Sequence, residues 1–153
     1  MRALGLLMFL GLLAATPGQP APALEGTAMR GGAVSLQRLR GRVVVVDFWA
    51  SWCEPCRRSF PTLDALARRH GAAGLTVVGV SVDDELGNAQ RFVRELRPSF
   101  PTLHDGSHQI AERWMPPSMP TTYLVGRDGT VLAALTGDDL QQLDARVAEA
   151  LGR

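Results

Sequence analysis

VVVVDFWASWCEPC, residues 43–56, contains the only two cysteines of the 153-residue chain, Cys53 and Cys56. Residues 43–49 are apolar except for Asp47, a pattern typical of a strand that is buried on both faces of a sheet. The residues that follow have helical spacing. The cysteine pair therefore lies where a strand ends and a helix begins, and it can close a disulfide across the first helical turn.

This position suits Cys53 to redox chemistry. Backbone N–H groups and the positive end of the helix dipole stabilise a thiolate there, and the thiolate is the form that attacks disulfides. A structural zinc site would need two more ligands, and the three histidines are scattered. A purely structural disulfide would stabilise so short a loop only weakly. The pattern predicts a dithiol redox catalyst without a metal or a cofactor.

The N-terminus has the pattern of an export signal. Arg2 precedes a small and apolar run over residues 3–15, and a Pro- and Ala-rich segment ends at Ala23. This predicts a signal peptide over residues 1–23, cleaved before Leu24. Residues 4–15 fall short of the about 20 apolar residues that span a bilayer, and an uncleaved membrane anchor remains the alternative.

The rest of the chain, residues 24–153, has the length of one domain with its own core. Export would place the cysteines in an oxidising compartment, so we expect a periplasmic or other extracytoplasmic location. The formal net charge is +1, and no basic run exceeds two residues. Nucleic-acid binding therefore has no electrostatic support.

The hydrophobic pattern predicts the order β-α-β-α followed by β-β-α, an α/β fold with a mixed sheet and helices on both faces. The expected elements are a hairpin over 24–34, a helical turn over 35–40, strands over 43–49 and 75–82, helices over 53–70, 88–96 and 109–114, a loop over 115–120, strands over 121–125 and 130–136, and a helix over 139–151. Asp139 is expected to cap that last helix, with Gln142 three residues on.

Four segments in this order resemble the thioredoxin superfamily, and within it the exported TlpA/ResA-like thiol:disulfide oxidoreductases, a redoxin or AhpC/TSA-related group. The segments are the turn over 35–41, residues 46–56, residues 80–83, and residues 119–125 before Asp128-Gly129. The resemblance covers residues 24–151. It implies a thioredoxin-like fold with a central mixed β-sheet and an N-terminal hairpin extension.

The resemblance also implies roles for individual residues. Cys53 matches the exposed nucleophile and Cys56 the buried resolving cysteine. Asp47 matches the buried acid that assists proton transfer to and from the resolving cysteine, and burial is expected to raise its pKa. Pro120 matches a cis-proline that faces the disulfide, and Met119 lines the substrate groove beside it.

We expect the substrate-binding surface to include Trp52, Glu54, Pro55 and Thr121 as well. Trp52 is expected to be partly exposed beside the disulfide. ResA-like proteins often carry a carboxylate three residues after the second cysteine, and Ser59 stands at that position here.

The favoured function is a periplasmic protein-disulfide reductase, with a role in cytochrome c maturation or copper-oxidase assembly among its possibilities. A peroxiredoxin-like peroxidase is an alternative, although Ala50 stands where such enzymes carry a hydroxyl. A copper metallochaperone is another, with His108, Met115 and Met119 as further ligands.

The implied partners are protein disulfides, apocytochrome c among them, and a membrane thiol carrier of the CcdA or DsbD kind as electron donor. A monomer is expected. Glu54 disfavours a thiolate at Cys53, so the chain is expected to act as a reductant and not as an oxidant.

Overall fold

The computed structural model describes residues 14–153, except for the side chain of Asp138. Residues 1–13, which contain Arg2 and most of the apolar run of the expected signal, lie outside the described residues. A five-stranded mixed sheet has the strand order β5-β4-β3-β6-β7, and a separate two-stranded hairpin is formed by β1 and β2. The strands are β1 Glu25–Thr27, β2 Ala33–Ser35, β3 Val43–Trp49, β4 Leu75–Ser81, β5 Thr102–His104, β6 Thr121–Val125 and β7 Val131–Thr136.

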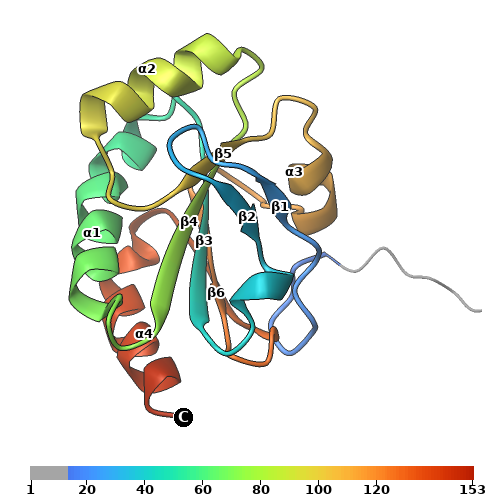
Figure 1. The fold of residues 1–153 in the computed structure, drawn as a ribbon, viewed down its shortest axis with the longest axis vertical. Helices are drawn as coiled ribbons and strands as arrows, with labels where there is room; N and C mark the ends of the chain where they lie inside the picture. Colours follow the sequence, from blue (N-terminus) through green and yellow to red (C-terminus); the bar gives the residue numbers. More distant parts are fainter. Residues whose placement is uncertain (1–13) are drawn as a thin grey trace, which may run out of the picture.

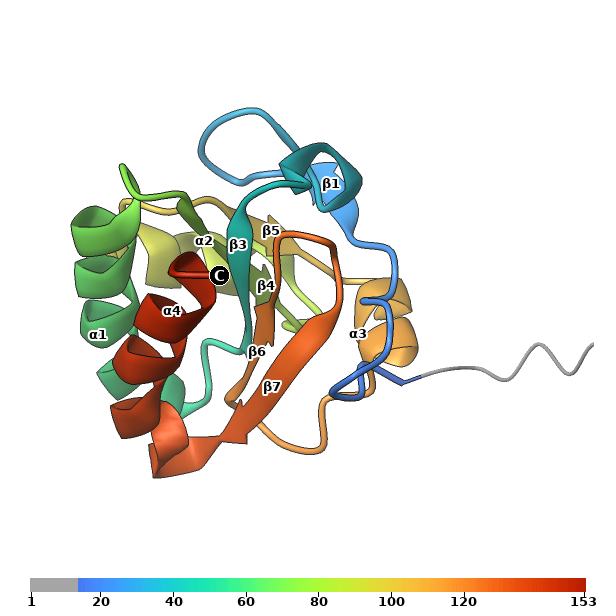
Figure 2. The same cartoon turned by 90° about the horizontal axis from the view of Figure 1, so that it is seen from below.

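The helices cover both faces of the sheet (Figures 1 and 2). Helices α1, α2 and α4 pack on one face, and α3 lies on the other, together with the hairpin. The helices are α1 Glu54–His70, α2 Leu86–Leu96, α3 Gln109–Trp114 and α4 Leu143–Leu151, with short 3-10 helices η1 Gln37–Leu39 and η2 Gly137–Gln142. The pattern predicts a mixed sheet with helices on both faces, and this is the thioredoxin-like arrangement that the resemblance implies.

Strand β3 lies at the centre of the sheet, and all seven of its residues are buried. It pairs in parallel with β4 and antiparallel with β6. Because successive side chains of a strand point to opposite faces, Val43 and Val45 join the core under α1, α2 and α4, whereas Val44 and Val46 join the core under α3. The continuous apolar run of β3 follows from this burial on both faces.

Two expectations about secondary structure are wrong. The sequence pattern missed β5, whose three residues are too few to show a period. The final helix does not begin near Asp139: residues Gly137–Gln142 form η2, and α4 starts at Leu143. No side chain caps either helix, so Asp139 does not act as an N-cap. A 3-10 turn commonly precedes an α-helix in this way.

The N-terminal segment, residues 14–23, packs against the domain. It pairs with the loop and strand around Val131, where Gly18 N donates to Val131 O and Val131 N donates to Gln19 O. Ala15 is buried, and its N–H donates to Trp114 O. The segment therefore pairs with the chain where β7 begins. No helix within residues 14–153 has the length and apolar character that a bilayer crossing requires.

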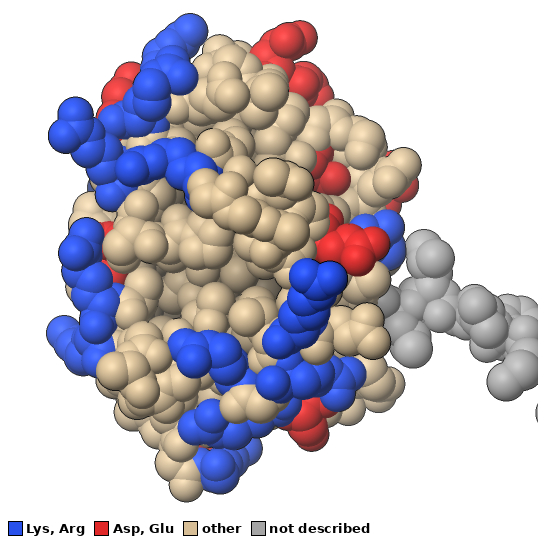
Figure 3. Space-filling model, viewed as in Figure 1, with Lys and Arg blue, Asp and Glu red and all other residues tan. Residues whose placement is uncertain are grey.

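Arginine side chains gather over the end of the sheet where β3 and β4 begin (Figure 3). Arg42 donates to Gly71 O and Leu75 O, and Arg127 donates to Gly41 O and Leu151 O. These carbonyl groups lie at or next to the ends of α1 and α4 and the starts of β3 and β4. These arginine side chains therefore hold the loops at this end of the sheet, opposite to Cys53, through hydrogen bonds to the backbone.

Candidate active site

The disulfide between Cys53 and Cys56 lies at the N-terminus of α1, directly after β3. Its S–S distance is 2.18 Å and its Cα–Cα distance is 5.3 Å. Cys53 has extended backbone angles and is the N-cap residue, and its sulfur accepts a hydrogen bond from Cys56 N at 3.2 Å. A sulfur held here faces the free N–H groups of the first turn, which stabilise negative charge on it.

The surroundings of the two sulfurs differ. In the disulfide form 4 % of Cys53 is exposed and none of Cys56 is. The neighbouring Trp52 is 71 % exposed, which confirms the expectation of an exposed ring beside the disulfide. An apolar ring in this position is available for contact with a partner chain. That Cys53 is the first thiol to react stays a prediction for the reduced protein.

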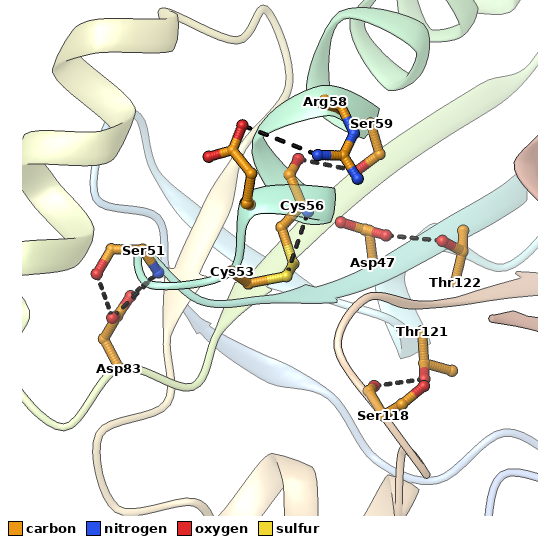
Figure 4. Close-up of a disulfide and its surroundings, with 11 residues drawn as sticks. Asp47, Ser51, Cys53, Cys56, Arg58, Ser59, Asp83, Ser118, Thr121 and Thr122 are labelled. Carbon is orange, nitrogen blue, oxygen red and sulfur yellow. Dashed lines mark hydrogen bonds and ion pairs between the residues drawn. A yellow bond between two sulfur atoms is a disulfide. The ribbon is translucent and has the colours of Figure 1, made fainter. Parts of the chain in front are cut away.

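Asp47 is fully buried on the other side of the disulfide (Figure 4). Its Oδ1 accepts a hydrogen bond from the Thr122 hydroxyl at 2.7 Å, and its Oδ2 has no hydrogen-bond partner among the described residues. Burial raises the pKa of Asp47 to about 7, and the Thr122 hydrogen bond lowers it only in part. Figure 4 shows Oδ2 on the side of the cysteines. The expected burial and raised pKa are confirmed.

The loop before β6 forms another wall of the site. The peptide bond between Met119 and Pro120 is cis, as the resemblance implies. Met119 is partly buried and packs against the core. Thr121 is fully buried, and its hydroxyl donates to Ser118 O at 2.7 Å. The side chain of Thr121 therefore closes this turn, and because Thr121 has no exposed surface it does not form part of the expected substrate-binding surface.

The first turn of α1 presents polar groups to solvent. Pro55 is in that turn, where a proline is tolerated because its missing N–H would have no helical partner. Glu54 and Arg58 are exposed, and their nearest charged atoms are 3.9 Å apart. Ser59 is buried, and its hydroxyl donates to Cys56 O. Ser59 thus bonds to the backbone of the helix and adds no charge beside the sulfurs.

Sequence reasoning missed two polar partners of the site. Thr122 is the partner of Asp47, from a strand 75 residues further along the chain. Asp83 lies at the end of β4 and accepts hydrogen bonds from Ser51, which precedes the cysteines. Only the position of Asp83 directly after a strand parallel to β3 could have indicated that contact.

Within residues 14–153, no group of three or more His, Cys, Asp or Glu side chains is placed to hold a metal ion. The cysteine pair is thus not part of a three-ligand group in the described residues, and the copper-binding alternative gains no support from it. His108 lies beside Asp84 instead, with 3.1 Å between Nε2 and Oδ1.

The sequence profile of the AhpC/TSA family matches residues 17–134. The chain belongs to the AhpC/TSA family. Among curated members, it is similar to the thiol-disulfide oxidoreductase ResA of Bacillus subtilis (strain 168), with 28 % identity over 130 residues that cover 85 % of this chain and 73 % of that protein. ResA of Oceanobacillus iheyensis is 33 % identical over 112 residues, 71 % of this chain and 58 % of the relative.

Solved structures lead to the same group of the family. A Chlorobium tepidum protein assigned as the thiol:disulfide interchange protein DsbE superposes with a TM-score of 0.86 and 34 % identity, covering 91 % of this chain and 100 % of the other. A secreted Mycobacterium tuberculosis disulfide oxidoreductase superposes with a TM-score of 0.70 and 26 % identity, covering 82 % and 95 %. With its cysteine pair at disulfide distance, the chain is a thiol-disulfide oxidoreductase of the ResA/DsbE type.

Proposed function

We propose that this protein reduces disulfides of other proteins outside the cytoplasm, cycling between the Cys53–Cys56 disulfide and the dithiol. One observation carries the proposal: Cys53 is the N-cap of α1, it directly follows the exposed Trp52, and the buried carboxyl of Asp47 points toward the cysteine pair (Figure 4). The exposed side of the site can receive a protein chain, and the buried side can supply or accept a proton.

The reductive half of the cycle runs as two exchanges. The Cys53 thiolate attacks one sulfur of a substrate disulfide, forms a mixed disulfide and releases the other substrate sulfur as a thiolate, which takes a proton from water. The Cys56 thiol then loses its proton to the Asp47 carboxylate and attacks the Cys53 sulfur. This step releases the second substrate thiolate and restores the enzyme disulfide, so two electrons pass to the substrate.

When a donor reduces the enzyme disulfide again, Asp47 acts as an acid instead of a base. When a donor dithiol attacks Cys53, Cys56 leaves as a thiolate in a site without water access. A neutral Asp47 can protonate it. A pKa near 7 keeps both protonation states of Asp47 populated at neutral pH, which is the condition for general acid–base catalysis in both directions.

The extracytoplasmic location is supported by the export pattern of the N-terminus and by the similarity to a secreted relative. A reductase in an oxidising compartment needs an electron donor, so we propose a membrane thiol carrier of the CcdA or DsbD kind. Apocytochrome c disulfides are the proposed substrate, because reduced haem-attachment cysteines are needed in that compartment.

The proposal can be tested by trapping the mixed disulfide between Cys53 and the substrate. In Cys56→Ser the attack by Cys53 proceeds but resolution is blocked, so the variant is expected to retain oxidised apocytochrome c as a covalent complex that dithiothreitol releases. Cys53→Ser is the matched control and is expected to retain none. A complex that forms with Cys53→Ser and not with Cys56→Ser would contradict the assigned roles.

The direction of exchange needs a second measurement. The equilibrium potential against glutathione is expected nearer the about −270 mV of thioredoxin than the about −120 mV of strong oxidants. A value at the oxidising end would overturn the reductase proposal. Rapid turnover with hydrogen peroxide, with no exchange on protein disulfides, would favour the peroxidase alternative instead.

A further inference from the structure

The turn that carries Cys53 is bound to a carboxylate that the exchange chemistry does not use. Residues Ala50 to Cys53 form a turn in which Cys53 N donates to Ala50 O at 3.1 Å. Ser51 N donates to both oxygens of Asp83, at 3.1 and 3.0 Å, and the Ser51 hydroxyl donates to Asp83 Oδ1 at 2.6 Å. Figure 4 shows this contact on the side of the disulfide away from Asp47.

Asp83 is itself held firmly. It is buried, and its Oδ2 accepts a hydrogen bond from the Ser81 hydroxyl at 2.7 Å. Its N–H donates to the same hydroxyl at 3.1 Å. Its carbonyl lies 2.7 Å from His104 Nε2, which must be the donor because a carbonyl can only accept. Asp83 is therefore anchored to β4 and β5 before it binds the turn.

No arginine or histidine forms an ion pair with the Asp83 carboxylate among the described residues. Its partners are the N–H and hydroxyl of Ser51 and the hydroxyl of Ser81. Burying a carboxylate is costly unless hydrogen bonds satisfy it. A buried carboxylate, whose burial costs free energy, is therefore used here to bind Ser51, two residues before the nucleophile Cys53.

We propose that Asp83, through Ser51, is a positioning residue that holds the Cys53 sulfur at the N-terminus of α1 when the disulfide is open. In the oxidised protein the bond to Cys56 already holds Cys53 in place. Reduction removes this bond, and the Ala50–Cys53 turn then depends on the Asp83 contact. The contact thus stabilises the reduced, attacking form more than the oxidised form.

The test uses the alkylation of Cys53 as a function of pH, in a Cys56→Ala background that leaves one thiol. Ser51→Ala is expected to raise the pH midpoint of alkylation by about one unit and to slow the reaction below it about tenfold, the factor that one hydrogen bond of ordinary strength corresponds to. Ser51→Thr keeps the hydroxyl and is expected to restore the wild-type midpoint.

The redox equilibrium with glutathione gives an independent readout, measured with both cysteines present. The substitution is expected to destabilise the reduced form more than the oxidised form. Ser51→Ala should therefore be about tenfold more easily oxidised, which shifts its reduction potential by about 30 mV in the negative direction. A merely structural contact would lower the thermal stability of both redox forms equally and leave this equilibrium unchanged, which would overturn the proposal.

Asp83→Asn separates position from charge. Loss of positioning raises the alkylation midpoint, whereas loss of a nearby negative charge lowers it. A lowered midpoint in Asp83→Asn together with an unchanged midpoint in Ser51→Ala would contradict the proposal. If Asp83→Asn does not fold, the comparison of Ser51→Ala with Ser51→Thr decides alone.

The chain offers a matched control away from the site. Asp64 of α1 accepts hydrogen bonds from Ser99 N and the Ser99 hydroxyl, at 2.6 and 2.5 Å, in the same aspartate–serine arrangement. Ser99→Ala is expected to leave both the alkylation midpoint and the redox equilibrium at wild-type values. Equal shifts in Ser99→Ala and Ser51→Ala would show that the effect is not specific to the Cys53 turn.

Discussion

Asp47 is the residue whose charge state links the stability of the protein to its chemistry. Its pKa is about 7 in the folded chain, against 3.8 for the free side chain, because burial disfavours the carboxylate. The folded state therefore binds the proton more tightly than the unfolded state between these values. The contribution of Asp47 to the free energy of unfolding is greatest below about pH 4. It decreases as the pH rises from about 4 to about 7, and it is lost above about pH 7.

We predict that Asp47→Asn removes this pH dependence. Above pH 7 the variant is expected to be more stable than the wild type, by an amount on the order of 4 kcal/mol, the free energy that about three pKa units represent. Urea unfolding at pH 5 and pH 8 measures it. An equal fall in stability from pH 5 to pH 8 in variant and wild type would assign the dependence to other groups.

The catalytic role of Asp47 predicts the opposite effect on activity. Asp47→Asn cannot exchange a proton with Cys56, so its disulfide exchange is expected to be slower by about 100-fold or more at pH 7.

Thr122→Val is the companion variant. It removes the hydrogen bond that favours the Asp47 carboxylate, so it is expected to raise the pKa of Asp47 and to move the midpoint of the pH–rate profile to higher pH. Identical profiles in Thr122→Val and the wild type would argue against Asp47 as the titrating group.

Among the elements, α2 packs against the sheet and α1 through the aromatic ring of Phe92. Phe92 stacks on Trp49 of β3 with 4.5 Å between ring centroids, and it meets Phe60 of α1 edge-on at 4.9 Å. The three rings lie in one buried cluster. Trp49 donates its ring N–H to the Thr102 hydroxyl of β5, so the same ring also ties the short edge strand to the core.

We predict that Phe92→Ala destabilises the protein by about 3–5 kcal/mol, the range for a large buried aromatic side chain. Leu86→Ala in the same helix is the control, because Leu86 is 43 % exposed, and it is expected to cost less than about 0.5 kcal/mol. Chemical denaturation of both variants measures the difference. Similar losses in the two variants would mean that the aromatic contact contributes little.

At the scale of the whole molecule, segments from the N-terminal part of the chain contact both edge strands of the sheet where those strands begin. Met29, which follows β1, donates its N–H to Thr102 O of β5, and the N-terminal segment hydrogen-bonds to Gly129 and Val131 at the start of β7. At these positions the edge groups are not free to pair with other chains. Cleavage after Ala23, as the signal pattern predicts, would remove the contacts at the start of β7.

We predict that a chain beginning at Leu24 is less stable than one beginning at Ala14. It loses the hydrogen bonds of the N-terminal segment to Trp114, Gly129 and Val131, so its melting temperature is expected to be lower by about 5–10 °C. Thermal unfolding of the two purified chains measures it. Equal melting temperatures would show that the segment adds no stability and that cleavage at Ala23 costs the fold nothing.

The sequence by itself determines the elements around the cysteines. The apolar run of β3, the cysteine pair and the turn residues near Gly129 are local patterns, and local periodicity predicts the strands, the long helix α1 and the β6–β7 hairpin. The resemblance of residues 119–125 to the superfamily adds the cis bond before Pro120.

Only the tertiary structure decides which residues meet across the sheet. The contacts of Asp47 with Thr122 and of Ser51 with Asp83 join residues that are 75 and 32 positions apart, and each depends on strand order and register. The sequence does not show that Asp83 supports the cysteine turn, or that residues 14–23 pack on β7. The reason is physical: periodicity reports which face of an element is buried, and register between distant strands decides what that face contacts.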